Sequence, residues 1–404
     1  MTSTTERRIT VLKRHLDGIE LQLMNKPTAL IVKYCGHLDE DALGKAYDCV
    51  ATRHPFVTGY IGKDLDGYFI EVRPDSTTQF VVHEAEDLSF LREVSASWDL
   101  ERAVAQLTVI RGTSGGFVAM HTDHAISDGT VKYRLLQELW EFYAEIVAGN
   151  RVAVSPNGSL PHSPARLLAK HLGLSDKKLD GSPDDVKADS FILSQKYISL
   201  SEEDTSQLVH AAQAMGTSVH ALLCGTVLVT QRNHIKTGDG SVLMACRTPV
   251  NIRKRLEPPV GPIEVTNFGG LQVAKVQVRK NDDPVAIGKE VKDQLDSGIA
   301  RGEPVRELAV RTPGEMESFG GPGLSIATVT NMGTVAEFAR AEGLEIVDFQ
   351  IFSHALAFSH PGYAVYTYSR RLNIQVMYRP ELHSVAEIDE ISSGVIGRLR
   401  SFGG

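Results

Sequence analysis

A histidine and an aspartate four residues apart have the types and the spacing for general-base chemistry. Residues 120–129 read MHTDHAISDG, in which His124, Asp128 and Gly129 form the pattern HxxxDG. A neutral imidazole that projects into a cavity from the end of a strand can accept the proton of an attacking hydroxyl or amine. An Asp followed by Gly suits a tight turn, and an arginine elsewhere can pair with this carboxylate and so set the direction of the histidine ring. The motif therefore predicts a site with a single base, His124.

These residues also have purely structural interpretations. His124 can be a partly buried loop histidine bonded to the backbone, and Asp128 can be the N-cap of the following helix. For Asp128 the two interpretations are compatible. His121 and His124 form HxxH, but the sequence has no HExxH, no CxxC and no further clustered ligand. We therefore expect no metal site.

Two further glycine-rich patterns are candidate functional motifs, and only the first matches one formally. Residues 112–116, GTSGG, fit GxSxG, but Ser114 lies between two strand-like runs and is expected in a hairpin turn, not in a nucleophile elbow. The run FGGPG at 319–323 lacks the P-loop lysine and the dinucleotide spacing, and it also predicts a turn. What remains is a single-base mechanism, without a bound cofactor, on a substrate that is already activated.

Periodicity predicts the elements that position the motif. In the first half it indicates helices at about 40–53 and from about 130, and strands at 29–34, 68–72, 80–83, 107–111 and 117–121. In the second half it indicates helices at 203–214 and 217–232, one opened by Asp283 and Pro284, and one from Ser384. The second-half strands are expected at 192–200, 242–246, 271–278, 324–330, 345–352, 364–368 and 373–378. The fold class is therefore α/β.

A change in residue composition divides the chain into two parts. Proline, glycine, serine and asparagine cluster between 149 and 188, which predicts a linker. We expect an N-terminal subdomain at 1–180, which carries HxxxDG, and a C-terminal subdomain at 189–404. Two α/β halves joined in this way favour a ligand site between them.

Composition excludes several classes of protein. With 404 residues, 42% hydrophobic and 23% charged, the chain is a folded globular protein. A net charge of −8 without a basic patch argues against a nucleic-acid partner. The N-terminus lacks an apolar signal region, the four cysteines are widely spaced, and the longest charge-free stretch, 205–231, is too polar for a membrane span. A cytoplasmic protein with reduced thiols and no transmembrane segment is expected.

Segments along most of the chain carry a family resemblance. They are RHPFVTG at 53–59, HxxxDG at 124–129, TPVNIR at 248–253, EPPVGP at 257–262, TNFGG at 266–270, PGL at 322–324 and GLEI at 343–346. Together they resemble the acyltransferase superfamily of chloramphenicol acetyltransferase, plant acyltransferases and peptide-synthetase condensation domains. Within it they are closer to the polyketide-associated acyltransferases of the phthiocerol dimycocerosyl transferase type.

The resemblance implies a fold and a set of roles. The fold would be two chloramphenicol-acetyltransferase-like subdomains, each a mixed sheet with flanking helices, around an active-site tunnel. His124 would be the general base and Asp128 a structural residue paired with Arg253 across the two halves. Gly129 would let the backbone approach the substrate, and Asn267 would line the tunnel. Where many relatives have a second histidine this chain has Asp123, whose carboxylate we expect at the tunnel and expect to raise the pKa of His124.

The expected reaction is acyl transfer, of EC 2.3.1 type. The first hypothesis is an O-acyltransferase that moves an acyl chain from a thioester, on coenzyme A or on the phosphopantetheine arm of an acyl carrier protein, to a small-molecule alcohol. Polyketide, lipid or other secondary-metabolite biosynthesis is the setting that the resemblance implies, and the family suggests a monomer. A free-standing condensation enzyme that makes an amide is the second hypothesis. A non-catalytic module that binds a carrier protein is the third.

Overall fold

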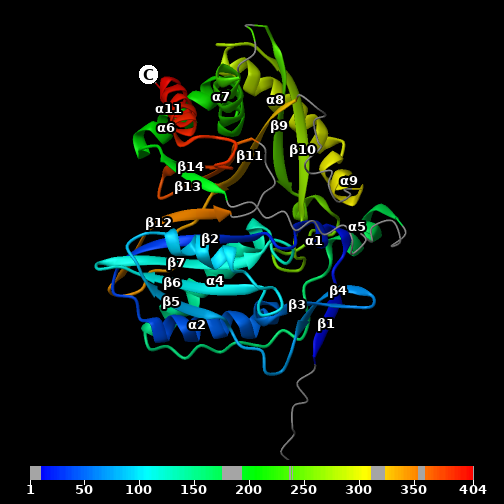
Figure 1. The fold of residues 1–404 in the computed structure, drawn as a ribbon, viewed down its shortest axis with the longest axis vertical. Helices are drawn as coiled ribbons and strands as arrows, with labels where there is room; N and C mark the ends of the chain where they lie inside the picture. The colour runs from blue at the N-terminus through cyan, green and yellow to red at the C-terminus, as the bar shows by residue number, and fades with distance from the viewer. Residues whose placement is uncertain are drawn as a thin grey trace, which may run out of the picture.

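The computed structural model describes residues 11–174, 193–235, 238, 240–310, 324–353 and 360–403. Its strands form a three-stranded sheet (β1-β4-β3), a five-stranded sheet (β12-β2-β7-β6-β5) and a six-stranded sheet (β10-β9-β11-β13-β14-β8). Figure 1 shows the five-stranded sheet with its helices in the lower half of the molecule and the six-stranded sheet with its helices in the upper half. Both larger sheets contain parallel and antiparallel pairs, so the predicted α/β fold with mixed sheets and flanking helices is confirmed.

The first half of the chain builds the smallest sheet and most of the five-stranded one. Its elements are β1 (Leu12–His15), α1 (Gly18–Leu23), β2 (Pro27–Gly36), α2 (Glu40–Arg53), η1 (Pro55–Thr58), β3 (Tyr60–Asp64), β4 (Gly67–Val72), β5 (Phe80–Glu84), α3 (Ser89–Ala96), β6 (Ala105–Arg111), β7 (Gly115–Asp123), α4 (Gly129–Val147) and α5 (Pro164–Leu172). The helices and strands predicted here are present. The short elements β1, α1, η1, β3, α3 and α5 were not predicted. Of these, α5 lies inside the proposed linker, whose residues 175–188 are outside the described residues.

The second half builds the six-stranded sheet and its helices. Its elements are β8 (Ser194–Ser199), α6 (Glu202–Ala214), α7 (Val219–His234), β9 (Val242–Asn251), η4 (Arg253–Arg255), β10 (Gly269–Val278), α8 (Pro284–Ala300), α9 (Glu303–Val310), β11 (Ser325–Thr334), β12 (Leu344–Ser353), β13 (Gly362–Tyr368), β14 (Arg371–Tyr378) and α11 (Val385–Ser401). Asp283 caps α8 with Pro284 in its first turn, and Ser384 caps α11, as predicted. The predicted helices and strands of this half are present, and the described residues add α9 and the short η4, which were not predicted.

The helices cover their sheets with apolar faces. In α4, residues such as Val131, Leu135 and Leu139 recur every three or four positions, and they are buried together with residues of α2 and of β2, β6 and β7. A second core joins residues of α6, α7, α8 and α11 to the six-stranded sheet. α4 is therefore held by its packing, and its N-terminus lies where β7 ends.

One strand crosses between the halves. β12 pairs antiparallel with β2 from Leu344 opposite Gly36 to Ser353 opposite Thr28, although it is separated from β2 by most of the chain. Figure 1 shows β12 at the edge of the lower sheet. Tyr366 of β13 donates its hydroxyl to the Phe349 carbonyl of β12 at 2.5 Å. The two sheets are thus joined by a strand as well as by loops.

Among the described residues, no single helix is long and apolar enough to cross a bilayer. Taken together, α6 and α7 pass the length and composition test, but they are bent by 100° relative to each other.

Candidate active site

The predicted motif forms the loop between β7 and α4. β7 ends at Asp123 and α4 begins at Gly129, so His124 is the first residue after the strand. The His124 N–H donates to the Lys26 carbonyl at 3.1 Å, just before β2 starts. The loop is thereby tied to the neighbouring strand and presents the imidazole at the end of the sheet.

The environment of the His124 ring fixes which nitrogen carries its proton. Nδ1 lies 3.0 Å from the Ser127 carbonyl oxygen, which only accepts, so Nδ1 is the protonated nitrogen. The Asn267 amide lies 3.4 Å from Nδ1 and donates instead to the His124 carbonyl at 3.1 Å. Nε2 is then the unprotonated nitrogen, with its lone pair available to take a proton. The residue as a whole is partly exposed.

The pKa of His124 is lowered, whereas the sequence predicted that the adjacent Asp123 carboxylate would raise it. Loss of hydration, aided by the nearby Lys132 ammonium, lowers the pKa of His124 to about 4. The Asp123 carboxylate does not offset this, because it is buried and accepts from the Lys26 N–H at 2.9 Å and the Ala125 N–H at 3.0 Å. Burial raises the pKa of Asp123 to about 6. Asp123 thus fixes the backbone at Ala125, next to His124, and at Lys26 before β2, and its lining of a tunnel stays a prediction.

Asp128 fills both roles that the sequence allowed. Its Oδ1 accepts from the Thr130 and Val131 N–H groups, each at 3.0 Å, which caps α4. Its Oδ2 accepts from Arg253 Nη1 at 2.5 Å and from the Phe268 N–H at 2.9 Å. The predicted ion pair with Arg253 is present and buried, with the side chains 12% and 2% exposed.

The loop that carries Asn267 is held by the same pair. Arg253 Nη2 donates to the Val265 carbonyl at 3.1 Å, and the Asp128 N–H donates to the Thr266 carbonyl at 3.1 Å. Residues 265–268 are therefore clamped between η4 and the start of α4. This clamp places the Asn267 amide against the His124 loop, as described above, while a lining role for Asn267 stays a prediction.

Gly129 faces open space. A Cβ built at this first residue of α4 meets no heavy atom within 4 Å, so the protein itself does not require glycine there. The backbone at the start of the helix is consequently accessible from the side on which that Cβ would point.

The segment RHPFVTG at 53–59 is bonded to α4, the helix that follows the His124 loop. His54 Nε2 lies 2.9 Å and Arg53 Nη1 3.2 Å from the Glu138 carboxylate of α4, which also receives Arg134 Nε at 2.9 Å. Glu138 is only 4% exposed. The motif thus holds α4 in place, and none of these ion pairs involves His124.

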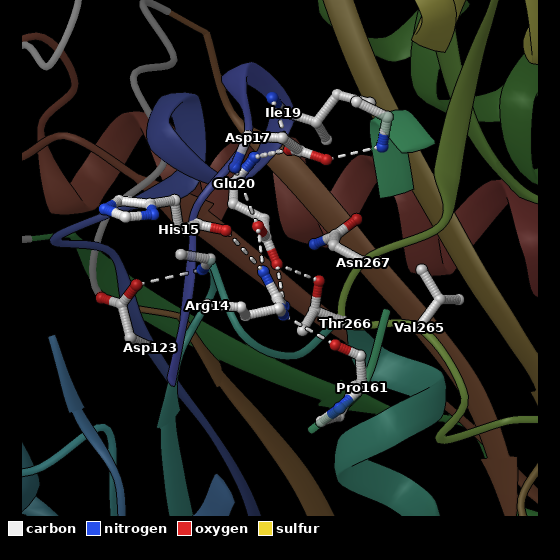
Figure 2. Close-up of polar contacts among 12 residues, drawn as sticks. Arg14, His15, Asp17, Ile19, Glu20, Asp123, Pro161, Val265, Thr266 and Asn267 are labelled. Atoms are coloured by element: carbon white, nitrogen blue, oxygen red, sulfur yellow. Dashed lines mark hydrogen bonds and ion pairs between the residues drawn. The ribbon is translucent and has the colours of Figure 1, made fainter. Parts of the chain in front are cut away.

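Sequence reasoning missed a buried cluster that continues from the site. Figure 2 shows the Glu20 carboxylate between Arg14 and Thr266, with Asn267 beside them. Arg14 binds Glu20 with both terminal nitrogens, at 2.8 and 2.6 Å, and Thr266 Oγ1 donates to Glu20 at 2.6 Å. Glu20 is fully buried. The N-terminal segment therefore supports the loop 265–268 through Thr266, in addition to the bonds from Asp128 and Arg253.

Asp17 completes this cluster. It caps α1 by accepting from the Ile19 and Glu20 N–H groups at 3.0 Å, and its other oxygen accepts from the Ala165 N–H of α5 at 2.6 Å. Burial and the charge of Glu20 raise the pKa of Asp17 to about 7. The only sequence signal was the acidic pair three residues apart, Asp17 and Glu20, which form a capping box.

Ser114, His121 and the run 319–323 belong to the alternative motifs and lie outside the His124 loop in the sequence. Ser114 lies in the turn between β6 and β7, where the Gly112 N–H donates to the Gly115 carbonyl at 2.8 Å, so the hairpin interpretation is confirmed. His121 is buried between Trp98 and Phe352, with ring centroids 5.9 and 6.4 Å away. The run 319–323 lies outside the described residues.

One cluster in the described part of the chain has a spacing that could suit a metal. It consists of His15, Asp64 and Asp66, none of them buried and all outside the motif. Lys13 Nζ already lies 2.8 Å from Asp64, so a cation competes with an ammonium group there. The cluster gives no reason to place a metal in the mechanism.

Comparison with known proteins supports the resemblance. Residues 189–377 match the family model described as the C-terminus of phthiocerol/phthiodiolone dimycocerosyl transferase. A phthiocerol/phthiodiolone dimycocerosyl transferase of Mycobacterium sp. (strain JLS) is 24% identical over 346 residues, covering 80% of this chain and 82% of that protein. The one from Mycobacterium ulcerans (strain Agy99) is 23% identical over 361 residues, covering 84% and 85%.

Solved structures share the fold over nearly the whole chain. Polyketide synthase associated protein 5 from Mycobacterium tuberculosis superposes with a TM-score of 0.79 at 20% identity, covering 97% of both chains. Trichothecene 15-O-acetyltransferase from Fusarium sporotrichioides gives 0.72 at 11% identity, covering 98% and 96%. The first condensation domain of the calcium-dependent antibiotic synthetase gives 0.71 at 14%, covering 97% and 96%. The chain therefore has the condensation-domain and acetyltransferase fold.

Proposed function

We propose that this chain, whose second half matches the phthiocerol/phthiodiolone dimycocerosyl transferases at 189–377, is an acyltransferase that moves an acyl group from a thioester to an alcohol. Relatives named as transferases that align with 80% or more of the chain support acyl transfer in general. The observation that carries the proposal is the orientation of His124, whose Nδ1–H is bound to the Ser127 carbonyl so that Nε2 keeps a free lone pair.

His124 acts as the general base in this reaction. As the acceptor hydroxyl attacks the thioester carbonyl carbon, Nε2 takes the hydroxyl proton and a new C–O bond forms. The tetrahedral intermediate then expels the sulfur, the C–S bond breaks, and the imidazolium returns its proton to the thiolate. Because Asp128 binds Arg253 and the backbone instead of the imidazole, it acts by holding the loop.

The thioester is a co-substrate, carried by coenzyme A or by the phosphopantetheine arm of an acyl carrier protein. Its activated carbonyl explains why this proposal needs neither a serine nucleophile nor a nucleotide loop. The solved neighbour named as polyketide synthase associated supports a carrier-protein donor and a polyketide or lipid product. A monomer in the cytoplasm, with a small alcohol as acceptor, completes the proposal.

A direct test offers the purified chain both donor types and both acceptor types. Medium-chain acyl-CoAs and acyl carrier proteins are incubated with a medium-chain alcohol or amine, and products are measured by mass spectrometry. We expect the ester, and none with His124→Ala. If only the amide is formed, the acceptor is an amine and the proposed alcohol acceptor is wrong. No product, together with carrier-protein binding, would show a binding module and refute the proposed catalysis.

A substitution at Gly129 tests whether substrate passes the start of α4. The Cβ of Gly129→Ala points into open space, so the free energy of unfolding is expected to be unchanged or to rise by up to ~1 kcal/mol. If a substrate uses that space, KM rises several-fold. The matched control is Gly397→Ala in α11, where a Cβ is equally unhindered. Equal KM values for both variants and the wild type would show that substrate does not approach Gly129.

A further inference from the structure

A buried lysine lies under the candidate catalytic loop. Lys132 is in the first turns of α4 and only 2% exposed. Its ammonium donates to three hydroxyl groups, those of Thr28, Thr122 (2.7 Å) and Ser127 (3.2 Å). Burying an ammonium group costs several kcal/mol unless it is well bonded, so this arrangement calls for an explanation.

The three hydroxyls come from three separate places in the fold. Thr28 and Thr122 are direct partners in the β2–β7 ladder, and both point to the face that α4 covers. Ser127 belongs to the loop and bonds to Thr122 as well. The lysine therefore ties the loop to β7, from which the loop emerges, and to the neighbouring strand β2.

Ser127 connects this lysine to the candidate base. The Ser127 hydroxyl accepts a hydrogen bond from the Lys132 ammonium, and the Ser127 backbone carbonyl accepts one from the Nδ1–H of His124. Fixing Ser127 fixes the group that sets the tautomer of the imidazole. The lysine charge also acts on the ring directly, since it disfavours a second positive charge nearby.

We propose that Lys132 is a positioning residue that holds Ser127 beneath His124 and, by its charge, keeps the imidazole unprotonated in mildly acidic solution. The proposal rests on His124 being the base. It adds a residue that contacts no substrate and acts through Ser127 and through its field.

The charges around Lys132 are consistent with this role. Asp123 at the end of β7 and Asp128 at the cap of α4 favour its protonated form, while burial lowers the pKa of Lys132 to about 7. Asp128 is already bound to Arg253 from η4, and Lys26, before β2, also acts to lower the pKa of His124. Below pH 7 Lys132 is therefore a cation, in the range where an ordinary histidine gains its proton.

The pH dependence of kcat/KM, measured with whichever donor and acceptor pair proves active, tests the proposal. Wild type is expected to lose little activity between pH 7.5 and 5. In Lys132→Met the acid limb is expected to move up by at least one pH unit, toward the ordinary imidazole pKa of about 6.5, which lowers the relative activity at pH 5 by about twofold or more. Thr28→Val is the control, because it removes one bond and keeps the charge, so its limb should match the wild type. An unmoved limb in Lys132→Met would refute the proposal.

An NMR titration separates this proposal from the function itself. The His124 imidazole signal, identified by its absence in His124→Ala, is followed with pH in the full-length wild type and in Lys132→Met. A wild-type midpoint well below 6.5 that rises in the variant supports the proposal even if no acyl transfer is found. A wild-type midpoint near 6.5 overturns it even if the enzyme is active or the variant fails to fold.

Discussion

His124→Ala is expected to lower kcat/KM for acyl transfer by about 10²- to 10⁴-fold, the usual contribution of a positioned general base. The fold should survive, because the ring of this partly exposed residue makes one close bond, from Nδ1 to the Ser127 carbonyl. The measurement is release of free thiol from an acyl-CoA or acyl carrier protein in the presence of the acceptor, together with the thermal unfolding midpoint.

His37→Ala is the matched control for this experiment. His37 is exposed and follows the opposite end of β2 from the site, so its removal should change neither rate nor stability. Partial recovery of His124→Ala with added imidazole would distinguish a missing base from a disturbed loop. A variant that turns over at the wild-type rate would exclude His124 as the base.

Asp128→Asn is expected to lower the free energy of unfolding by about 3–5 kcal/mol, because it leaves the buried Arg253 guanidinium without its carboxylate. Asparagine is also a favoured N-cap, so the start of α4 keeps its cap and the loss reports mainly on the ion pair. The rate should fall as well, since residues 265–268 lose part of the clamp that places Asn267 against the His124 loop. Denaturant unfolding and kcat/KM are measured on the same preparation.

A double-mutant cycle identifies the pair. Arg253→Met in the Asp128→Asn background removes the unpaired charge, so the double variant should be less destabilised than the sum of the single variants. Asp296→Asn, which breaks the exposed pair with Lys292, serves as a surface control and should leave the unfolding midpoint unchanged. Additive losses in the cycle would mean that the two side chains do not interact in solution.

The sequence was sufficient where local signals and the final contacts agree. The apolar stripe of α4 and the strand-like run of β7 placed His124 and Asp128 in the loop between them. The Asp128–Arg253 pair was expected only through the family resemblance, because 125 positions separate the two residues and no local pattern joins them. Periodicity can predict which face of a helix is buried, but it cannot predict which residue of a distant loop contacts that helix.

Other parts of the site depend on packing that no local pattern encodes. The bond from Thr266 to Glu20 spans 246 positions, and its acceptor lies in a six-residue helix too short to be recognised by periodicity. The low pKa of His124 results from burial and from the charge of Lys132. The carboxylate of the adjacent Asp123 accepts hydrogen bonds from two backbone N–H groups. Lys132 itself did leave a signal, since it interrupts the apolar face formed by Val131 and Leu135.

The five-stranded sheet gains its edge strand β12 long after its other four strands have been synthesised. β2 ends at Gly36, whereas its edge partner β12 begins at Leu344, roughly 300 residues later. At about 5–20 residues per second the nascent chain carries that unpaired edge for about 15–60 s, a time during which an open strand can pair with other chains. A chain that ends before β12 would therefore leave the β2 edge of the sheet that carries the His124 loop unpaired.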